Sequence, residues 1–262
     1  MVELLRRAYR HRVLIWLLAV KELKIRYNRS ALGFLWALLH PLLMAVVLTI
    51  VFSSLLRISI DHYPVFLLST LFPWTFFSQS LNYATQSVVS NGSLMKKVYV
   101  PALVFPLASV LANLVNFLLS LIPLALMLIV LGFPFHSTWW YLPVPMLSLV
   151  ILATGCGLVL ATANVFFRDV AQILQILLAA WFYASPIIYD LQFMSPGLRT
   201  VLRLNPLSDI LGAFRLAIYG DVHQGLLPSM ESIVLSLAVP VLVLLVGYEV
   251  FRRNEDTLVL YV

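Results

Sequence analysis

The sequence has few charged residues and only one cysteine. Charged side chains make up 11% of its 262 residues, whereas an ordinary soluble domain has about 25%. Hydrophobic residues make up 62%, and the mean hydropathy is +0.98. So little polar surface excludes a soluble globular protein and indicates an integral membrane protein. The single cysteine, Cys156, excludes a disulfide bond within one chain.

The common signatures of catalysis and metal binding are also missing. The sequence has no G-x-x-x-x-G-K-[ST] loop to bind ATP phosphates, no H-E-x-x-H, no Cys/His cluster and no G-x-S-x-G. None of the eleven acidic residues lies at the centre of an apolar run, where a proton relay would need one. We therefore predict no catalytic, cofactor-binding or metal site in this chain. Any transport would need energy from a partner.

Long apolar runs dominate the sequence and predict an all-α membrane protein with six transmembrane helices. The runs are continuous and about 20 residues long, which is typical of spanning helices and not of barrel strands. The predicted spans are residues 33–56, 63–89, 102–131, 142–167, 170–188 and 232–251. Prolines and glycines interrupt the segment between spans five and six, where pieces 198–204 and 207–219 predict short re-entrant or outer helices. We expect a single domain at 33–262 after an N-terminal cytoplasmic segment at 1–32.

The cations are distributed unevenly between the two sides of this topology. Eight Lys and Arg residues precede residue 33, and five more lie on the same side: Lys96, Lys97, Arg168, Arg252 and Arg253. The remaining four lie on the other side: Arg57, Arg199, Arg203 and Arg215. Because short cationic flanks stay in the cytoplasm, both termini are expected there, in a bacterial plasma (inner) membrane. The pI of 9.6 reflects cations that flank the predicted spans. At such positions they would contact anionic lipid, and no binding to nucleic acid is needed to account for them.

Residues 13–29 are too short and too charged to span and predict an amphipathic interfacial helix. Apolar residues recur at spacings of three and four along one stripe: Val13, Trp16, Val20, Leu23 and Tyr27. Glu22, Arg26 and Arg29 fall on the opposite face. The stripe would lie in the acyl boundary. The polar face would be left free for the cytoplasm or a partner.

Several short segments carry a resemblance to a known family. Residues 21–36 read KELKIRYNRSALGFLW and are followed by Pro41-Leu42. Further matches are KVYVP at 97–101, NVFFRDV at 164–170, SPIIY at 185–189 and Asn205-Pro206. In this order they resemble the permease subunits of type-2 ATP-binding-cassette (ABC) exporters. The branch exporting O-antigen, capsule-like glycans or teichoic acid is the most similar.

The resemblance implies a homodimer of six-span subunits with two cytoplasmic ABC ATPase subunits, which would bind ATP and magnesium. A lipid-linked glycan would pass through a channel between the protomers, lined largely by spans one and five. The N-terminal helix and the loop after span two would meet the ATPase through Lys21, Glu22, Lys24, Arg26, Arg29, Lys96, Lys97 and Tyr99. Lipid headgroup contact or simple positive-inside anchoring is the alternative for these residues. Many relatives have a cation soon after Pro101, whereas Ala102 and Leu103 follow it here.

Aromatic residues in spans one and five are candidates for lining such a channel, because sugar rings stack on aromatic faces without deep binding wells. These candidates are Phe34, Trp36, Trp181, Phe182 and Tyr183. Packing in the core or against lipid is the alternative. On the outer side Tyr189, Arg199, Arg203 and Arg215 are candidates for an outer gate that could meet a pyrophosphate headgroup. Structural pairing of the arginines with Asp190, Asp209 and Asp221 is the alternative that we favour.

Three other functions fit parts of this pattern. A lipid or drug exporter would share the same architecture. A membrane enzyme acting on polyprenyl-linked sugars would need acidic or His residues clustered on one membrane face, and none cluster in the sequence. A signalling or scaffold protein would not need the broken outer segment.

Overall fold

The structure is a computed structural model that describes residues 2–28, 35–51, 62–98, 100–134, 137–190, 194–203, 205–220 and 230–261. Within these ranges the regular elements are all helices, as the sequence predicts. In chain order they are α1 (Val2–Arg10), α2 (Arg12–Tyr27), α3 (Leu35–Thr49), α4 (Tyr63–Ser90), α5 (Gly92–Lys97), α6 (Val104–Val130), the 3-10 helix η2 (Ser137–Tyr141), α7 (Pro143–Phe166), α8 (Val170–Tyr183), α9 (Pro196–Arg203), α10 (Pro206–Ile218) and α11 (Met230–Tyr261).

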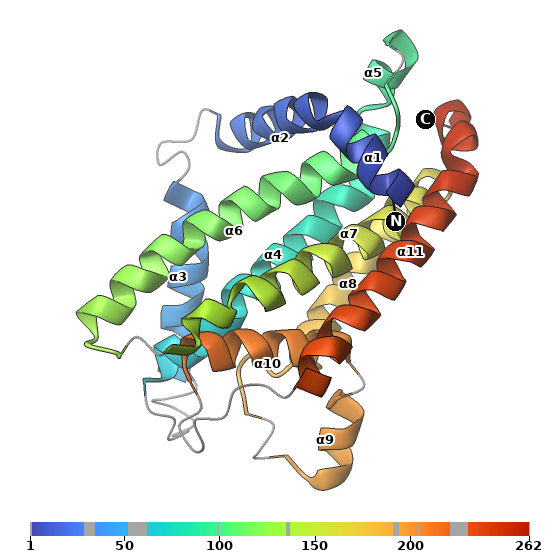
Figure 1. The fold of residues 1–262 in the computed structure, drawn as a ribbon. Coiled ribbons are helices and arrows are strands. Elements are labelled where there is room, and N and C mark those ends of the chain that lie inside the picture. Colours follow the sequence, from blue (N-terminus) through green and yellow to red (C-terminus); the bar gives the residue numbers. More distant parts are fainter. Residues whose placement is uncertain are drawn as a thin grey trace.

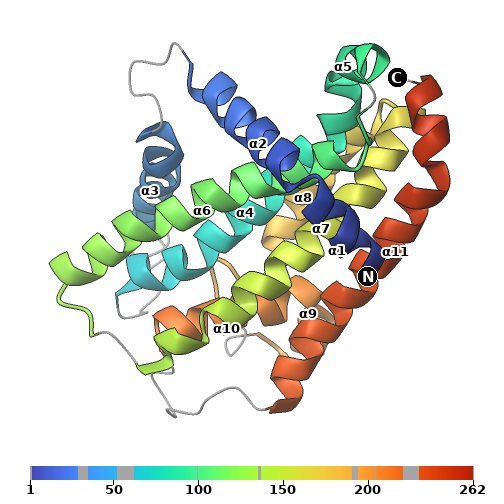
Figure 2. The same ribbon diagram turned by 45° about the horizontal axis from the view of Figure 1, so that its top comes forward.

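The long helices run between two ends of a bundle. Both chain termini, α1, α2 and α5 lie at one end, and α9 and α10 lie at the other (Figure 1). The second view shows α2 lying across α6, while α3 stands at the edge of the bundle (Figure 2). Proline occurs in the first turn of α4, α7 and α10, where a missing N–H costs nothing.

Helix α4 is the centre of the core. It packs against α6 and α7 along most of its length, and Phe66, Phe72 and Phe77 on it are buried. Helices α7 and α11 form the closest pair. Their backbones touch because Gly155 and Gly247 have no side chain at the crossing.

The two ends of the chain are tied together at the end that holds α1. Arg7 on α1 donates two hydrogen bonds to the Glu255 carboxylate on α11, at 3.0 and 2.8 Å. Burial by itself would lower the pKa of Arg7, but its hydrogen bond with Glu255 contributes to a pKa above the ordinary value. The charged form of the pair is therefore stable, and it fixes α1 against α11.

Two helical segments in the described residues are both long and apolar enough to cross a membrane: Val104–Val130 and Thr138–Phe166. Helices α3 and α8 have 15 and 14 residues, fewer than the about 20 that a straight span needs. Helix α4 has 28 residues but carries a row of polar side chains. The count of six spans therefore stays a prediction.

Several predicted boundaries were wrong. The fifth segment ends as a helix at Tyr183 and not at 188, because residues 185–189 form a turn before α9. The helix of the sixth segment continues to Tyr261, ten residues beyond the predicted end. Ion pairs from Glu249 to Arg252 and Arg253 support this extension. The loop predicted after the second segment contains the short helix α5.

Candidate functional site

A row of polar side chains follows one face of α4. Its members recur at spacings of three, one, three and four residues: Thr75, Ser78, Gln79, Asn82 and Gln86. Such spacing keeps them on one side of the helix. Sequence reasoning missed this row, although its helical period inside an apolar run was a readable signal.

These side chains form the floor of an open groove, the α4 groove. One part has a volume of about 420 Å³ and is walled by Met44 on α3 and by Ala179, Phe182 and Tyr183 on α8. The other part, about 680 Å³, extends under α2 and along α6. The two parts share Gln79, Asn82 and Gln175, so the groove is continuous. A polar floor with aromatic walls suits a ligand with both hydroxyl groups and C–H faces.

The four predicted lining aromatics that the structure describes do not all lie together. Phe182 and Tyr183 line the α4 groove, and Tyr183 is 67% exposed. Trp36 lines a smaller pocket beside it. Trp181 instead turns toward the core, where its Nε1 donates to Asn205 Oδ1 at 3.0 Å and its ring meets Phe77 edge-on. Phe34 lies outside the described residues.

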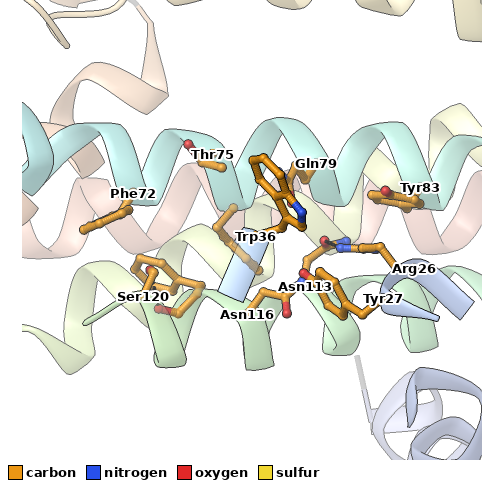
Figure 3. Close-up of a pocket in the computed structure, with 12 residues that line it drawn as sticks. Arg26, Tyr27, Trp36, Phe72, Thr75, Gln79, Tyr83, Asn113, Asn116 and Ser120 are labelled. Carbon is orange, nitrogen blue, oxygen red and sulfur yellow. Dashed lines mark hydrogen bonds between the residues drawn. The ribbon is translucent and has the colours of Figure 1, made fainter. Parts of the chain in front are cut away.

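The polar face of α2 is not free at Glu22 and Arg26, so that prediction was wrong for these two residues. Arg26 Nη1 donates to Asn113 Oδ1 at 2.9 Å, and Nη2 donates to Glu22 Oε1 at 3.1 Å. Ser109 Oγ donates to Glu22 Oε2 at 2.9 Å. The Arg26 guanidinium lies 3.7 Å from the centre of the Tyr83 ring (Figure 3). This network anchors α2 to α4 and α6.

The exposed lysines of the predicted coupling set lie on two elements at the same end of the bundle. Lys21 and Lys24 are exposed on α2, and Lys96 and Lys97 are exposed in the last turn of α5 (Figure 1). Arg29 and Tyr99, which complete the predicted set, lie outside the described residues. This end therefore carries exposed lysines on both α2 and α5, and Lys21 also lines the part of the α4 groove that extends under α2.

Arg215 on α10 braces the turn at 185–189. Its Nη2 donates to the carbonyl oxygens of Pro186 and Ile187 at 2.7 and 3.0 Å, and Nη1 donates to the Tyr189 carbonyl at 3.3 Å. Its guanidinium also lies 3.7 Å from the Phe66 ring centre. The sequence suggested carboxylate partners for this arginine. Asp190 does interact with it electrostatically, but the acceptors of these hydrogen bonds are backbone carbonyls.

The other predicted outer residues are less fully placed. Tyr189 donates its hydroxyl proton to the Tyr183 carbonyl at 2.8 Å. Arg199 lies on α9, and the side chain of Arg203 falls outside the described residues, as does Asp221. Their gating role stays a prediction.

Asn205 is the residue of this region that sequence reasoning underrated. Its Oδ1 accepts from Trp181 and from the Leu207 N–H at the start of α10. Its Nδ2 donates to the Ala184 carbonyl and to Ser185 Oγ. Asn before Pro is a typical helix N-terminal cap, which was the available signal. Asn205 thus joins the ends of α8 and α10.

Comparison with known proteins places the chain in a family. The family model described as ABC-2 type transporter matches residues 13–219. The chain is 35% identical to the O-antigen export system permease protein RfbA of Myxococcus xanthus, over 98% of each chain. It is 29% identical to RfbA of Klebsiella pneumoniae, over 89% of this chain and 88% of that protein. It is 25% identical to the polysialic acid transport protein KpsM of Escherichia coli, over 94% and 95% respectively. The chain therefore belongs to the ABC-2 type transporter family.

Proposed function

We propose that this chain is the channel-forming permease subunit of an ATP-driven exporter of lipid-linked polysaccharide in a bacterial inner membrane. The substrate would be an O-antigen, a capsule-like glycan or a teichoic acid. The relatives named as O-antigen permeases and a polysialic acid transport protein support this class of substrate. The chain itself would perform no catalysis, and a partner ATPase would bind ATP and magnesium.

The observation that carries the proposal is the α4 groove, which runs along the bundle with one side open. Amide side chains such as Gln79 and Asn82 would face lipid if the open side met the bilayer, and burying unpaired amides in hydrocarbon is costly. A second copy of the chain removes this cost by closing the groove into a channel. Apolar side chains exposed on the flanking helices supply the contact surface: Val46 and Val47 on α3, Ile176 and Leu177 on α8.

The same proposal includes a six-span topology with both termini in the cytoplasm. Helices α3 and α8 would cross with the help of the turns that follow them. Helices α9 and α10 would lie at the outer mouth, opposite the basic end of the bundle. The positive-inside distribution of Lys and Arg supports this orientation.

The ATPase would dock on the basic surface formed by Lys21 and Lys24 on α2 and Lys96 and Lys97 on α5. Since α2 is anchored to α4 and α6 through Glu22 and Arg26, movement of this surface would reach the groove directly. Glu22 and Arg26 would then transmit force and not make the docking contact. This division follows from their inward hydrogen bonds.

The test is to co-express the chain with a candidate ABC ATPase from the same organism, purify the complex and measure ATP hydrolysis and glycan-lipid export in liposomes. We expect co-purification, and export that depends on ATP. The double variant Lys96→Glu with Lys97→Glu should abolish docking or export, whereas Arg168→Glu should not, because this exposed cation lies on the turn between α7 and α8 and not on α2 or α5. ATP-dependent transport of a lipid or drug but not of any glycan lipid would refute the polysaccharide assignment. Normal export by the double variant would refute the docking surface.

A further inference from the structure

A second, smaller cavity lies beside the α4 groove. Its volume is about 140 Å³, and it is enclosed by α2, α4 and α6 with Trp36 of α3 at its side. Figure 3 shows the side chains of α4 and α6 facing one another across it, with Arg26 and Tyr27 at one end. It shares Gln79, Tyr83 and Arg26 with the groove. A ligand moving along the groove would therefore pass its entrance.

The cavity contains a polar side chain whose hydrogen-bonding capacity is not filled in the described part of the chain. Asn116 on α6 is only 8% exposed, yet neither its Oδ1 nor its Nδ2 makes a well-formed hydrogen bond there. It has a weak interaction with the Tyr27 hydroxyl at the end of the cavity. Asn113, one turn earlier on the same face, is fully engaged with Arg26 and the Ser109 carbonyl. A buried amide with two donors and an acceptor left largely unused is costly, so it indicates a group whose remaining partners come from a ligand.

The charge in this cavity is balanced. Arg26 is its only cation, and the Glu22 carboxylate lies against it at 3.1 Å. Tyr83 covers one face of the guanidinium, and Asn113 accepts from it. An anion entering the cavity would have to compete with Glu22 for the same N–H groups. The arrangement therefore favours a neutral ligand over a phosphate.

The rest of the lining consists of hydroxyl, amide and aromatic side chains. Thr75, Gln79 and Ser120 can donate and accept hydrogen bonds, as sugar hydroxyls do. Trp36 and Phe76 add flat apolar faces, and Trp36 is 45% exposed. A ring with hydroxyl groups on its edge and C–H groups on its face satisfies both kinds of surface. By contrast, an acyl chain would leave the amides unpaired.

We propose that this cavity binds one neutral sugar residue of the transported glycan, with Asn116 as its central hydrogen-bonding group. The inference rests on the proposed function, because it assigns the cavity to the same substrate. The sugar hydroxyls pair with Asn116 and Gln79, and the ring lies against Trp36. Because the cavity is next to the anchored end of α2, an occupied cavity links the substrate to the helix that the ATPase moves.

The test measures weak binding of free methyl glycosides to the full chain in nanodiscs of phosphatidylethanolamine and phosphatidylglycerol, by saturation-transfer difference NMR. The probes are the methyl glycosides of mannose, galactose, glucose, rhamnose and N-acetylglucosamine, with sodium pyrophosphate as the anionic arm. The variants are Asn116→Leu and Trp36→Ala. The matched control is Asn164→Leu, which changes another buried asparagine with an unpartnered oxygen, on α7. Thermal melting is measured on every variant.

We expect at least one methyl glycoside to bind the native chain and the Asn164→Leu variant, and to bind Asn116→Leu at least tenfold more weakly. Asn116→Leu should melt close to the native chain, since its amide has no well-formed hydrogen bond to lose, only a weak interaction with Tyr27. Trp36→Ala tests the same cavity at a half-exposed position where folding is not at risk. The proposal would be overturned if pyrophosphate were the only probe that bound. It would also be overturned if no probe bound to a chain whose complex with the ATPase exports normally. Failure to assemble with the ATPase would instead refute the proposed function.

Discussion

The crossing of α7 and α11 should be intolerant of a single added methyl group. A Cβ built at Gly247 would overlap the Gly155 carbonyl oxygen, and one built at Gly155 would lie 2.6 Å from the Leu244 backbone nitrogen. Ordinary contact begins at 3.4 Å, so the helices would have to separate by about 0.8 Å in the second case. Both obstacles are backbone atoms, which cannot move unless the whole helix moves. Gly247→Ala should therefore loosen the entire pair.

The size of the effect follows from two opposing contributions. Overpacking of this kind costs about 1–3 kcal/mol, while replacing Gly by Ala in a helix stabilises by about 1 kcal/mol. Because the obstacles here are backbone atoms, the overpacking cost falls in the upper part of this range, at about 2–3 kcal/mol, and the net loss for Gly247→Ala is about 1–2 kcal/mol. For a chain of this size each kcal/mol lowers the melting temperature by about 2–4 °C.

The assay is thermal melting in detergent, followed by circular dichroism and by dye labelling of Cys156, the only thiol in the chain. The matched control is Gly212→Ala on α10, where a Cβ meets no atom within 4 Å. The control should melt at or above the native temperature. If Gly247→Ala did the same, the close crossing of α7 and α11 would be refuted.

Two other changes test the contacts that hold the ends of the bundle. Arg7→Glu should lower stability by about 1–2 kcal/mol in melting experiments, because it breaks a partly buried ion pair in which Nη2 donates to both carboxylate oxygens, and adding Glu255→Arg should restore part of it. No restoration in the double variant would show that the pair is not direct. Arg215→Lys should destabilise almost as much as Arg215→Met, since an ammonium cannot reach the carbonyls of Pro186 and Ile187 together with Tyr189. A lysine variant with native melting would exclude the bracing role.

Local signals in the sequence were enough to predict where several of the helices lie. The apolar runs at 63–89 and 142–167 match α4 and α7 to within one residue at each end. The breaks around Pro196 and Pro206 predicted two short helices, which appear as α9 and α10. Proline, glycine and hydrophobic period act within a few residues, so they can be read without a fold.

The direction of each side chain was harder to predict, because the environment of a helical face depends on which other element packs against it. The charged face of α2 was assigned outward by analogy with interfacial helices, but Asn113 and Ser109 on α6 supply polar partners that turn Glu22 and Arg26 inward. Trp181 was grouped with its neighbour Tyr183, yet one side chain is turned to Asn205 and the other is exposed. A rotation of 100° per residue separates such neighbours.

The sequence by itself determined that this chain is helical and apolar and which family it resembles, because composition and short-range pattern decide these properties. Only the tertiary structure decided that the polar row of α4 lines an open groove, that the buried amide of Asn116 has no well-formed hydrogen bond in the described residues, and that Gly155 meets Gly247. Each of these depends on contacts between helices distant in the chain. Such contacts follow from packing, which no single segment specifies.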